Sequence, residues 1–148
     1  MNTPTTSFQV LLQVGAAFQV AIAILNLFLT RLLKWQQDVA RMPLLLREVF
    51  QVHVWFISIT LTLFGVMTWR FATEMASGAD VTCQWLAAGI GIFWGIRTVI
   101  QIAYYSGSHW RGLPVRTLAH VALLILYGAF AVLYLWSAFV TPPPITFQ

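Results

Sequence analysis

Four long runs of apolar residues divide the chain, and short polar connections separate them. The runs cover about residues 8–30, 44–69, 81–105 and 115–140. Each run reaches or exceeds the ~20 residues that a helix needs to cross a bilayer. A bilayer accepts only helices or closed barrels, and these runs are far too long for barrel strands. The pattern therefore predicts an all-α, polytopic membrane protein, with four transmembrane helices forming a single four-helix bundle over residues 1–148.

The composition supports a membrane location and excludes several classes of protein. Hydrophobic residues make up 59% of the chain and charged residues 8%, whereas soluble domains carry about 25% charged residues. A soluble enzyme and a disulfide scaffold are therefore excluded, the latter because Cys83 is the single cysteine. The net charge of +4 does not indicate a nucleic-acid partner, because the bases lie between apolar runs instead of on one clustered surface.

The distribution of basic residues predicts the orientation in the membrane. The first connection carries Arg31, Lys34, Arg41 and Arg47, and the third carries Arg111 and Arg116. The second connection has Arg70 against Glu74 and Asp80. Basic loops mark the cytoplasmic side. We therefore expect the first and third connections inside and both termini outside, in a multi-pass protein of a bacterial-type inner (plasma) membrane. The residues before the first run lack the bases of a signal peptide, so this run is expected to stay in the mature protein.

The first connection has a helical pattern of its own. Its apolar residues recur at spacings of three, four and three, at Leu32, Trp35, Val39 and Met42. A charged set follows the same spacing at Arg31, Lys34, Asp38 and Arg41. Two such faces are typical of a short helix at the membrane interface, with the apolar side in lipid and the charges in water.

Polar residues inside the apolar runs identify the candidate site. Ionisable groups within a membrane are costly and usually face protein or water. At ~1.5 Å per residue, His53 lies ~14 Å from the cytoplasmic end of its run, Arg97 ~12 Å, His120 ~8 Å and Asn26 ~6 Å. Each of the four runs thus brings a polar group to the cytoplasmic leaflet. The main candidates are His53, Arg97, Gln101 and His120, followed by Tyr104, Glu48 and Asn26.

Two faces of the third run have different expected roles. Arg97, Gln101 and Tyr104 share one stripe, and an Arg97–Glu48 ion pair would give the arginine a partner. Small residues, among them Gly91 and Gly95, lie on the opposite stripe. Small residues allow close approach of another helix. We therefore expect the Gly91/Gly95 face to contact another helix, which can belong to another membrane subunit or to a second copy in a homo-oligomer.

Several functions for the polar cluster stay open. It can be a structural network in a small membrane-complex subunit, or a site for a small ligand. Histidines on two helices are the usual way in which a bundle holds haem, so His53 and His120 are candidate axial ligands of a haem b, the metal site of this hypothesis. A quinone pocket beside them is an alternative, and a small ion or metabolite transporter is a further one.

Part of the chain resembles a known enzyme family. Arg97, the pair Ala103–Tyr104 and the stretch Leu113–Arg116 look like the third-to-fourth helix region of the membrane-associated eicosanoid and glutathione metabolism proteins. The resemblance implies a four-helix trimer that binds glutathione through buried arginines, and a membrane-embedded transferase for lipophilic substrates. The likeness covers residues 97–116. The second run departs from the family, because Arg47–His53 lacks the arginine-rich stretch followed by Asn and Glu.

Overall fold

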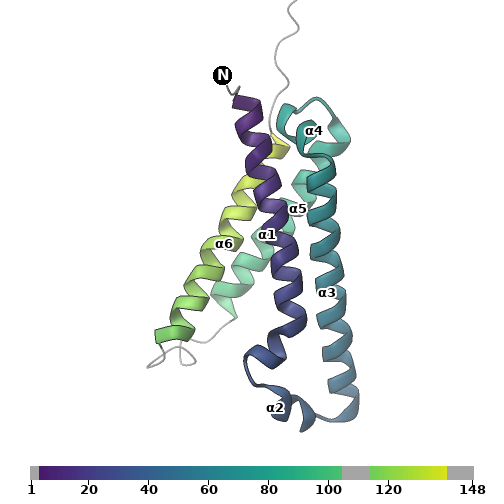
Figure 1. Cartoon of the computed structure of the whole chain (residues 1–148), viewed down its shortest axis with the longest axis vertical. Helices are drawn as coiled ribbons and strands as arrows, with labels where there is room; N and C mark the ends of the chain where they lie inside the picture. Colours follow the sequence, from purple (N-terminus) through teal and green to yellow (C-terminus); the bar gives the residue numbers. More distant parts are fainter. Residues whose placement is uncertain (1–3, 105–113, 140–148) are drawn as a thin grey trace, which may run out of the picture. The chain divides into compact units, whose positions relative to one another are not determined.

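The computed structural model describes residues 4–104 and 114–139, and these residues form only helices and the turns between them. The helices are α1 (Pro4–Leu32), α2 (Gln36–Ala40), α3 (Leu44–Arg70), α4 (Ala72–Ser77), α5 (Val81–Ala103) and α6 (Pro114–Ala138) (Figure 1). Four of them, α1, α3, α5 and α6, are long and apolar enough to cross a membrane. The prediction of an all-α chain with four helices able to span a membrane is therefore confirmed for the described residues.

Local sequence signals explain where the long helices begin. Pro4 and Pro114 occupy the first positions of α1 and α6. Proline is tolerated there because the first turn has no use for its missing N–H. Pro43 precedes α3 in an extended conformation with ψ 142°. The carboxylate of Asp80 accepts a 2.9 Å hydrogen bond from the Cys83 N–H and so caps α5. The four long helices start and end within a few residues of the predicted spans.

The first connection contains the short helix α2. The preceding helix α1 ends in a Schellman motif, in which the Trp35 N–H donates to the Thr30 oxygen and the Lys34 N–H to the Arg31 oxygen. Lys34 has φ 57°, the left-handed conformation that this motif requires. A residue with a Cβ pays about 1–2 kcal/mol there, so the turn is held by its hydrogen bonds. The location of α2 at a membrane interface stays a prediction.

The second connection contains α4, a helix that the sequence pattern does not predict. Its buried residues Ala72, Met75 and Ala76 follow the spacing of one helical face. Only six residues are helical, so the periodicity is too short to recognise from sequence. Gly78, with φ 64°, follows the end of this helix in the left-handed conformation. Arg111 of the third connection lies outside the described residues.

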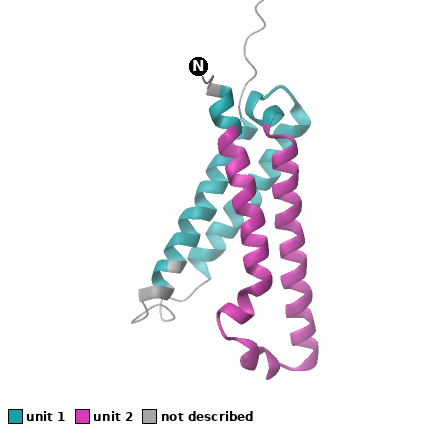
Figure 2. Cartoon of the chain, viewed as in Figure 1, with its two compact units in different colours: residues 1–9, 73–148 teal, residues 10–72 magenta. Residues whose placement is uncertain are grey.

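Contacts divide the chain into two compact units, shown in teal and magenta in Figure 2. The first unit comprises residues 1–9 and 73–148, and the second comprises residues 10–72. In the second unit, α1 and α3 approach closely at Gly65. A Cβ on this glycine would lie 2.7 Å from Val20 Cγ2 and 2.9 Å from the Ala16 oxygen. The assignment of the whole chain to a single domain stays a prediction.

In the first unit, α5 and α6 pack against each other in opposite directions. Gln101 contacts His120 near one end of the pair, and Gly91 faces Leu135 towards the other. A Cβ on Gly91 would lie 2.9 Å from the Leu135 nitrogen, whereas a Cβ on Gly95 would meet nothing within 4 Å among the described residues. Gly91 thus lies against α6 of its own unit, and contact of the Gly91/Gly95 face with another subunit or a second copy stays a prediction. Crossing helices come closest at one level, and these glycines are a full turn apart.

Candidate functional site

The centre of the candidate site is the contact between Gln101 on α5 and His120 on α6. The amide nitrogen of Gln101 lies 2.9 Å from Nδ1 of His120. Gln101 is 4% exposed, although it lies close to the end of α5. Its side-chain oxygen Oε1 is buried and has no hydrogen-bond partner among the residues that the structure describes. The site therefore contains a buried polar atom that the described protein groups leave unsatisfied.

Reversing the orientation of the amide does not remove this deficit. An amide oxygen and nitrogen can be exchanged by a flip, and the proton of a neutral histidine can sit on either ring nitrogen. In one arrangement Gln101 donates to His120 and its oxygen stays unsatisfied. In the other, His120 donates to the Gln101 oxygen and the amide nitrogen lacks an acceptor. An unsatisfied buried polar group costs about 1–3 kcal/mol. A hydrogen-bond partner for the second amide atom of Gln101 would remove this cost.

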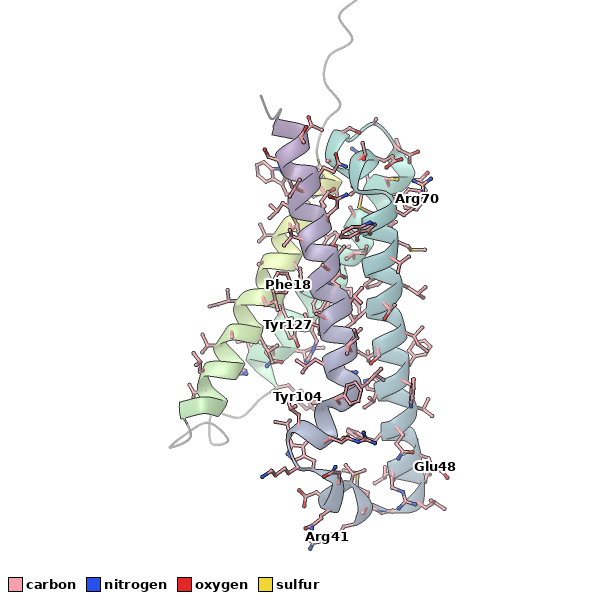
Figure 3. All side chains as sticks on the ribbon, in the orientation of Figure 1. Phe18, Arg41, Glu48, Arg70, Tyr104 and Tyr127 are labelled. Carbon is pink, nitrogen blue, oxygen red and sulfur yellow. The ribbon has the colours of Figure 1, made fainter. Side chains whose placement is uncertain are left out.

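Arg97 lies one turn before Gln101 on the same face of α5. Its side chain is half-buried, and Cζ lies 5.4 Å from the centroid of the Tyr127 ring (Tyr127 is labelled in Figure 3). A cation over an aromatic ring gains about 0.5–2 kcal/mol. Among the described residues of its own unit, no carboxylate forms an ion pair with Arg97, and the pairing with Glu48 of the other unit stays a prediction. Within its own unit, the guanidinium is therefore positioned by an aromatic ring and not by a carboxylate.

Aromatic side chains pack beside Arg97 at the interface of α5 and α6. Trp94 is almost fully buried, and its ring centroid lies 5.0 Å from that of Tyr127 and 4.8 Å from that of Phe130. None of these three residues is among the candidates predicted from the sequence. Tyr127 lies seven residues after His120, so helical spacing could have placed them on one stripe. The contacts of Trp94 and Phe130 depend on the register of the two helices, which no local pattern encodes.

Asn26 takes part in a separate set of hydrogen bonds in the second unit. Its amide nitrogen donates to the Val54 oxygen at 3.1 Å and to Ser58 Oγ at 2.9 Å. The Ser58 hydroxyl in turn donates to the Val54 oxygen at 2.9 Å. These bonds tie α1 to α3 and involve only groups of the protein. These bonds connect two helices of one unit, and a ligand-binding role of Asn26 stays a prediction.

The remaining candidates are His53 and Glu48, which belong to the second unit, and Tyr104, which belongs to the first. His53 and Glu48 are exposed on α3, and Figure 3 shows Glu48 projecting from this helix. Tyr104 follows α5 as its C-cap and is 86% exposed. The proposed Arg97–Glu48 ion pair and the haem ligation by His53 and His120 would each join residues of different units, and both stay predictions. Among the described residues, no three His, Cys, Asp or Glu side chains are grouped as in a metal site.

Comparisons with known proteins add no family assignment. No protein-family model, curated protein or solved structure matches the chain. The resemblance to the eicosanoid and glutathione metabolism proteins therefore depends on residues 97–116 alone, and of these, residues 105–113 lie outside the described residues. A function for this chain is therefore inferred from the local geometry of the α5–α6 pair and not from a related protein.

Proposed function

We propose that this chain is a small multi-pass subunit of a bacterial-type inner membrane and that it binds a small ligand between α5 and α6. Its binding residues are Gln101, His120 and Arg97. The observation that carries the proposal is the buried amide of Gln101, which contacts His120 and keeps one unsatisfied position among the described residues. A ligand atom at that position would remove the cost of the unsatisfied group.

The comparison with Asn26 supports a ligand over a purely structural network. In that second network, the amide nitrogen finds two acceptors and the neighbouring Ser58 hydroxyl finds one. Satisfied polar groups are what a network needs if it only holds helices together. The Gln101 nitrogen likewise contacts an acceptor, His120, but Gln101 is more deeply buried than Asn26, and its oxygen, unlike any atom of Asn26, is both buried and without a partner among the described residues. Two polar groups of one chain thus differ in the way that distinguishes a structural contact from an incomplete site.

The proposed orientation follows from charge. The first connection contains four of the eight basic residues, and basic connections stay on the cytoplasmic side. With that side inside, the ends of α5 and α6 that carry Gln101 and His120 lie in the cytoplasmic leaflet, and both termini are outside. The exposed apolar residues Trp35 and Met42 beside α2 support a position of this helix at the same interface.

A ligand-dependent stability measurement tests the binding function. The detergent-purified chain is heated with a short-chain quinone, with glutathione or with phosphatidylglycerol, and Gln101→Leu is compared with Gln51→Leu. Gln51 is exposed on α3, so the control makes the same chemical change away from the α5–α6 contact. At least one ligand should stabilise wild type and Gln51→Leu by about 2.7 kcal/mol at 100-fold excess over Kd, and should stabilise Gln101→Leu by only about 1.4 kcal/mol if its Kd rises tenfold.

The same samples distinguish the other functions. A purely structural network predicts no stabilisation by any ligand and a Gln101→Leu variant at least as stable as wild type, and that result would overturn the proposal. A haem b protein would show a Soret band that disappears in both His53→Ala and His120→Ala. A glutathione-dependent transferase of the family that residues 97–116 resemble would be stabilised by glutathione, and Arg97→Leu would abolish the effect.

A further inference from the structure

The position of the Arg97 guanidinium restricts the kind of ligand. Arg97 lies about 9 Å before the end of α5, and helical side chains lean towards the N-terminus of their helix. Cζ accordingly lies over the ring of Tyr127, which is about 20 Å from the start of α6 and about 17 Å from its end. The cation is thus held towards the middle of the helix pair. Long basic side chains near a membrane surface usually extend to the headgroups instead.

A partner for Arg97 must therefore enter the apolar depth of the pair. A phospholipid phosphate stays at the headgroup level, and a water-soluble anion would lose its hydration there. An uncharged, lipophilic molecule with a hydrogen-bond acceptor avoids both costs. Ile100, three residues after Arg97 and on the same side of α5, is an exposed apolar residue, so the surface beside Arg97 suits an apolar tail.

The Gln101–His120 pair adds a second restriction, because it can present either a donor or an acceptor. When the amide nitrogen donates to His120 Nδ1, the Gln101 oxygen is left to accept from a ligand. When His120 donates to that oxygen, the amide nitrogen is left to donate to a ligand. The two states differ by an amide flip and a change of tautomer. The pair therefore suits a ligand group that exists both as a carbonyl and as a hydroxyl.

From these two restrictions, and resting on the binding function proposed above, we infer that the ligand is a lipophilic quinone and its quinol. A quinone carbonyl accepts from the Gln101 amide or from Arg97, and the quinol hydroxyl donates to the Gln101 oxygen. The ring is planar and apolar, like the Trp94 and Tyr127 rings that pack beside the site. The inference concerns recognition of both forms and includes no electron transfer by this chain.

Calorimetric titration of the full chain in detergent tests the inference. The probes are a benzoquinone with one prenyl unit and its quinol, prepared by borohydride reduction and kept under nitrogen. Wild type and Gln51→Leu should bind both probes with Kd values within about threefold of each other, because the pair serves either form. Gln101→Leu should weaken both by up to about tenfold, the effect of one lost hydrogen bond. Arg97→Leu should weaken quinone binding by a similar factor.

The outcomes separate this inference from the binding function. If glutathione or phosphatidylglycerol binds in a Gln101-dependent way and neither probe binds, the site exists and the quinone assignment is wrong. A quinone Kd that is unchanged in both Gln101→Leu and Arg97→Leu would also overturn the assignment, because the quinone would bind elsewhere. If no compound binds, both proposals fail. Should Gln101→Leu not fold, Gln101→Met retains the side-chain length, and the wild-type preference among the four compounds still decides the ligand class.

Discussion

The side-chain nitrogen of Gln101 and Nδ1 of His120 are 2.9 Å apart, although 19 positions separate the two residues in the sequence. This contact joins two of the four main site candidates and connects α5 to α6 near the end of α5. Arg97, one turn earlier, extends the polar face towards Tyr127. The same helix pair is closed at a deeper level by Gly91 and Leu135. The α5–α6 interface therefore contains both a tight contact, at Gly91, and an unsatisfied polar group, at Gln101.

The tight contact predicts different effects for two neighbouring glycines. Gly91→Ala should destabilise the protein by about 1–3 kcal/mol, the usual effect of overpacking, because the new methyl group would lie 2.9 Å from the Leu135 backbone nitrogen. Gly95→Ala should be neutral or slightly stabilising, since no described atom lies within 4 Å of its Cβ. Thermal unfolding in detergent measures both. Equal destabilisation by the two variants would contradict the contact and would point to a further helix packed on Gly95.

The hydrogen bonds of Asn26 predict a modest structural effect. Asn26→Leu removes the donor that reaches Val54 and Ser58 on α3. Interhelical hydrogen bonds in membranes contribute about 0.6 kcal/mol on average and up to about 1.7. Asn26→Leu should therefore lower the free energy of unfolding by an amount within that range. Thr60→Val is the matched control, because its hydroxyl bonds only to Phe56 of its own helix. Ligand binding at the α5–α6 pair should be unchanged in Asn26→Leu, and a loss of binding there would argue against a purely structural role.

The cap of α5 predicts a pH dependence at low pH. The hydrogen bond from the Cys83 N–H lowers the pKa of Asp80 below its ordinary value of 3.8. The carboxylate then stabilises the fold fully above the ordinary pKa, and this contribution is lost as the pH falls through the lower folded-state value. Asp80→Ala should therefore be less stable than wild type near neutral pH, and the difference should shrink on acidification below 3.8.

Thermal unfolding between neutral and acidic pH measures this effect. Asp38→Ala serves as the control at neutral pH, since Asp38 is exposed within α2 and does not cap a long helix. A difference between Asp80→Ala and wild type that stays constant down to the lowest pH would show that the charge of Asp80 does not contribute to the cap.

The distribution of basic residues predicts the topology. A phosphatase reporter fused after Gln148 should be active, because this enzyme folds only outside the cytoplasm and the C-terminus is predicted to be there. The same reporter inserted after Gln37, between the bases of the first connection, should be inactive. The opposite pattern would invert the orientation and move the α5–α6 site to the outer leaflet, while leaving its local geometry unchanged.

Hydrophobic pattern alone was sufficient for the four membrane helices, because a bilayer leaves the backbone few alternatives to a helix. Their bounds follow from signals that act over a few residues, such as Pro43 before α3 and Asp80 before α5. The polar residues of the α5–α6 site were also visible in advance, because Arg97, Gln101 and His120 interrupt apolar runs. Each of these inferences depends on local chemistry or on the cost of placing a group in lipid.

Pairing between helices required the tertiary structure, because spacing along one helix identifies a face but not the residue that the face meets. Gly91 and Gly95 are indistinguishable by that criterion, yet only Gly91 lies against a described helix backbone, at Leu135. In the same way, Asn26 and Gln101 are both amides in apolar runs, and the sequence predicts a place in the polar site for both. The register of α1 on α3 supplies Asn26 with acceptors, whereas that of α5 on α6 leaves one atom of Gln101 unsatisfied among the described residues. That difference is set by helix crossing and depth, which no single segment encodes.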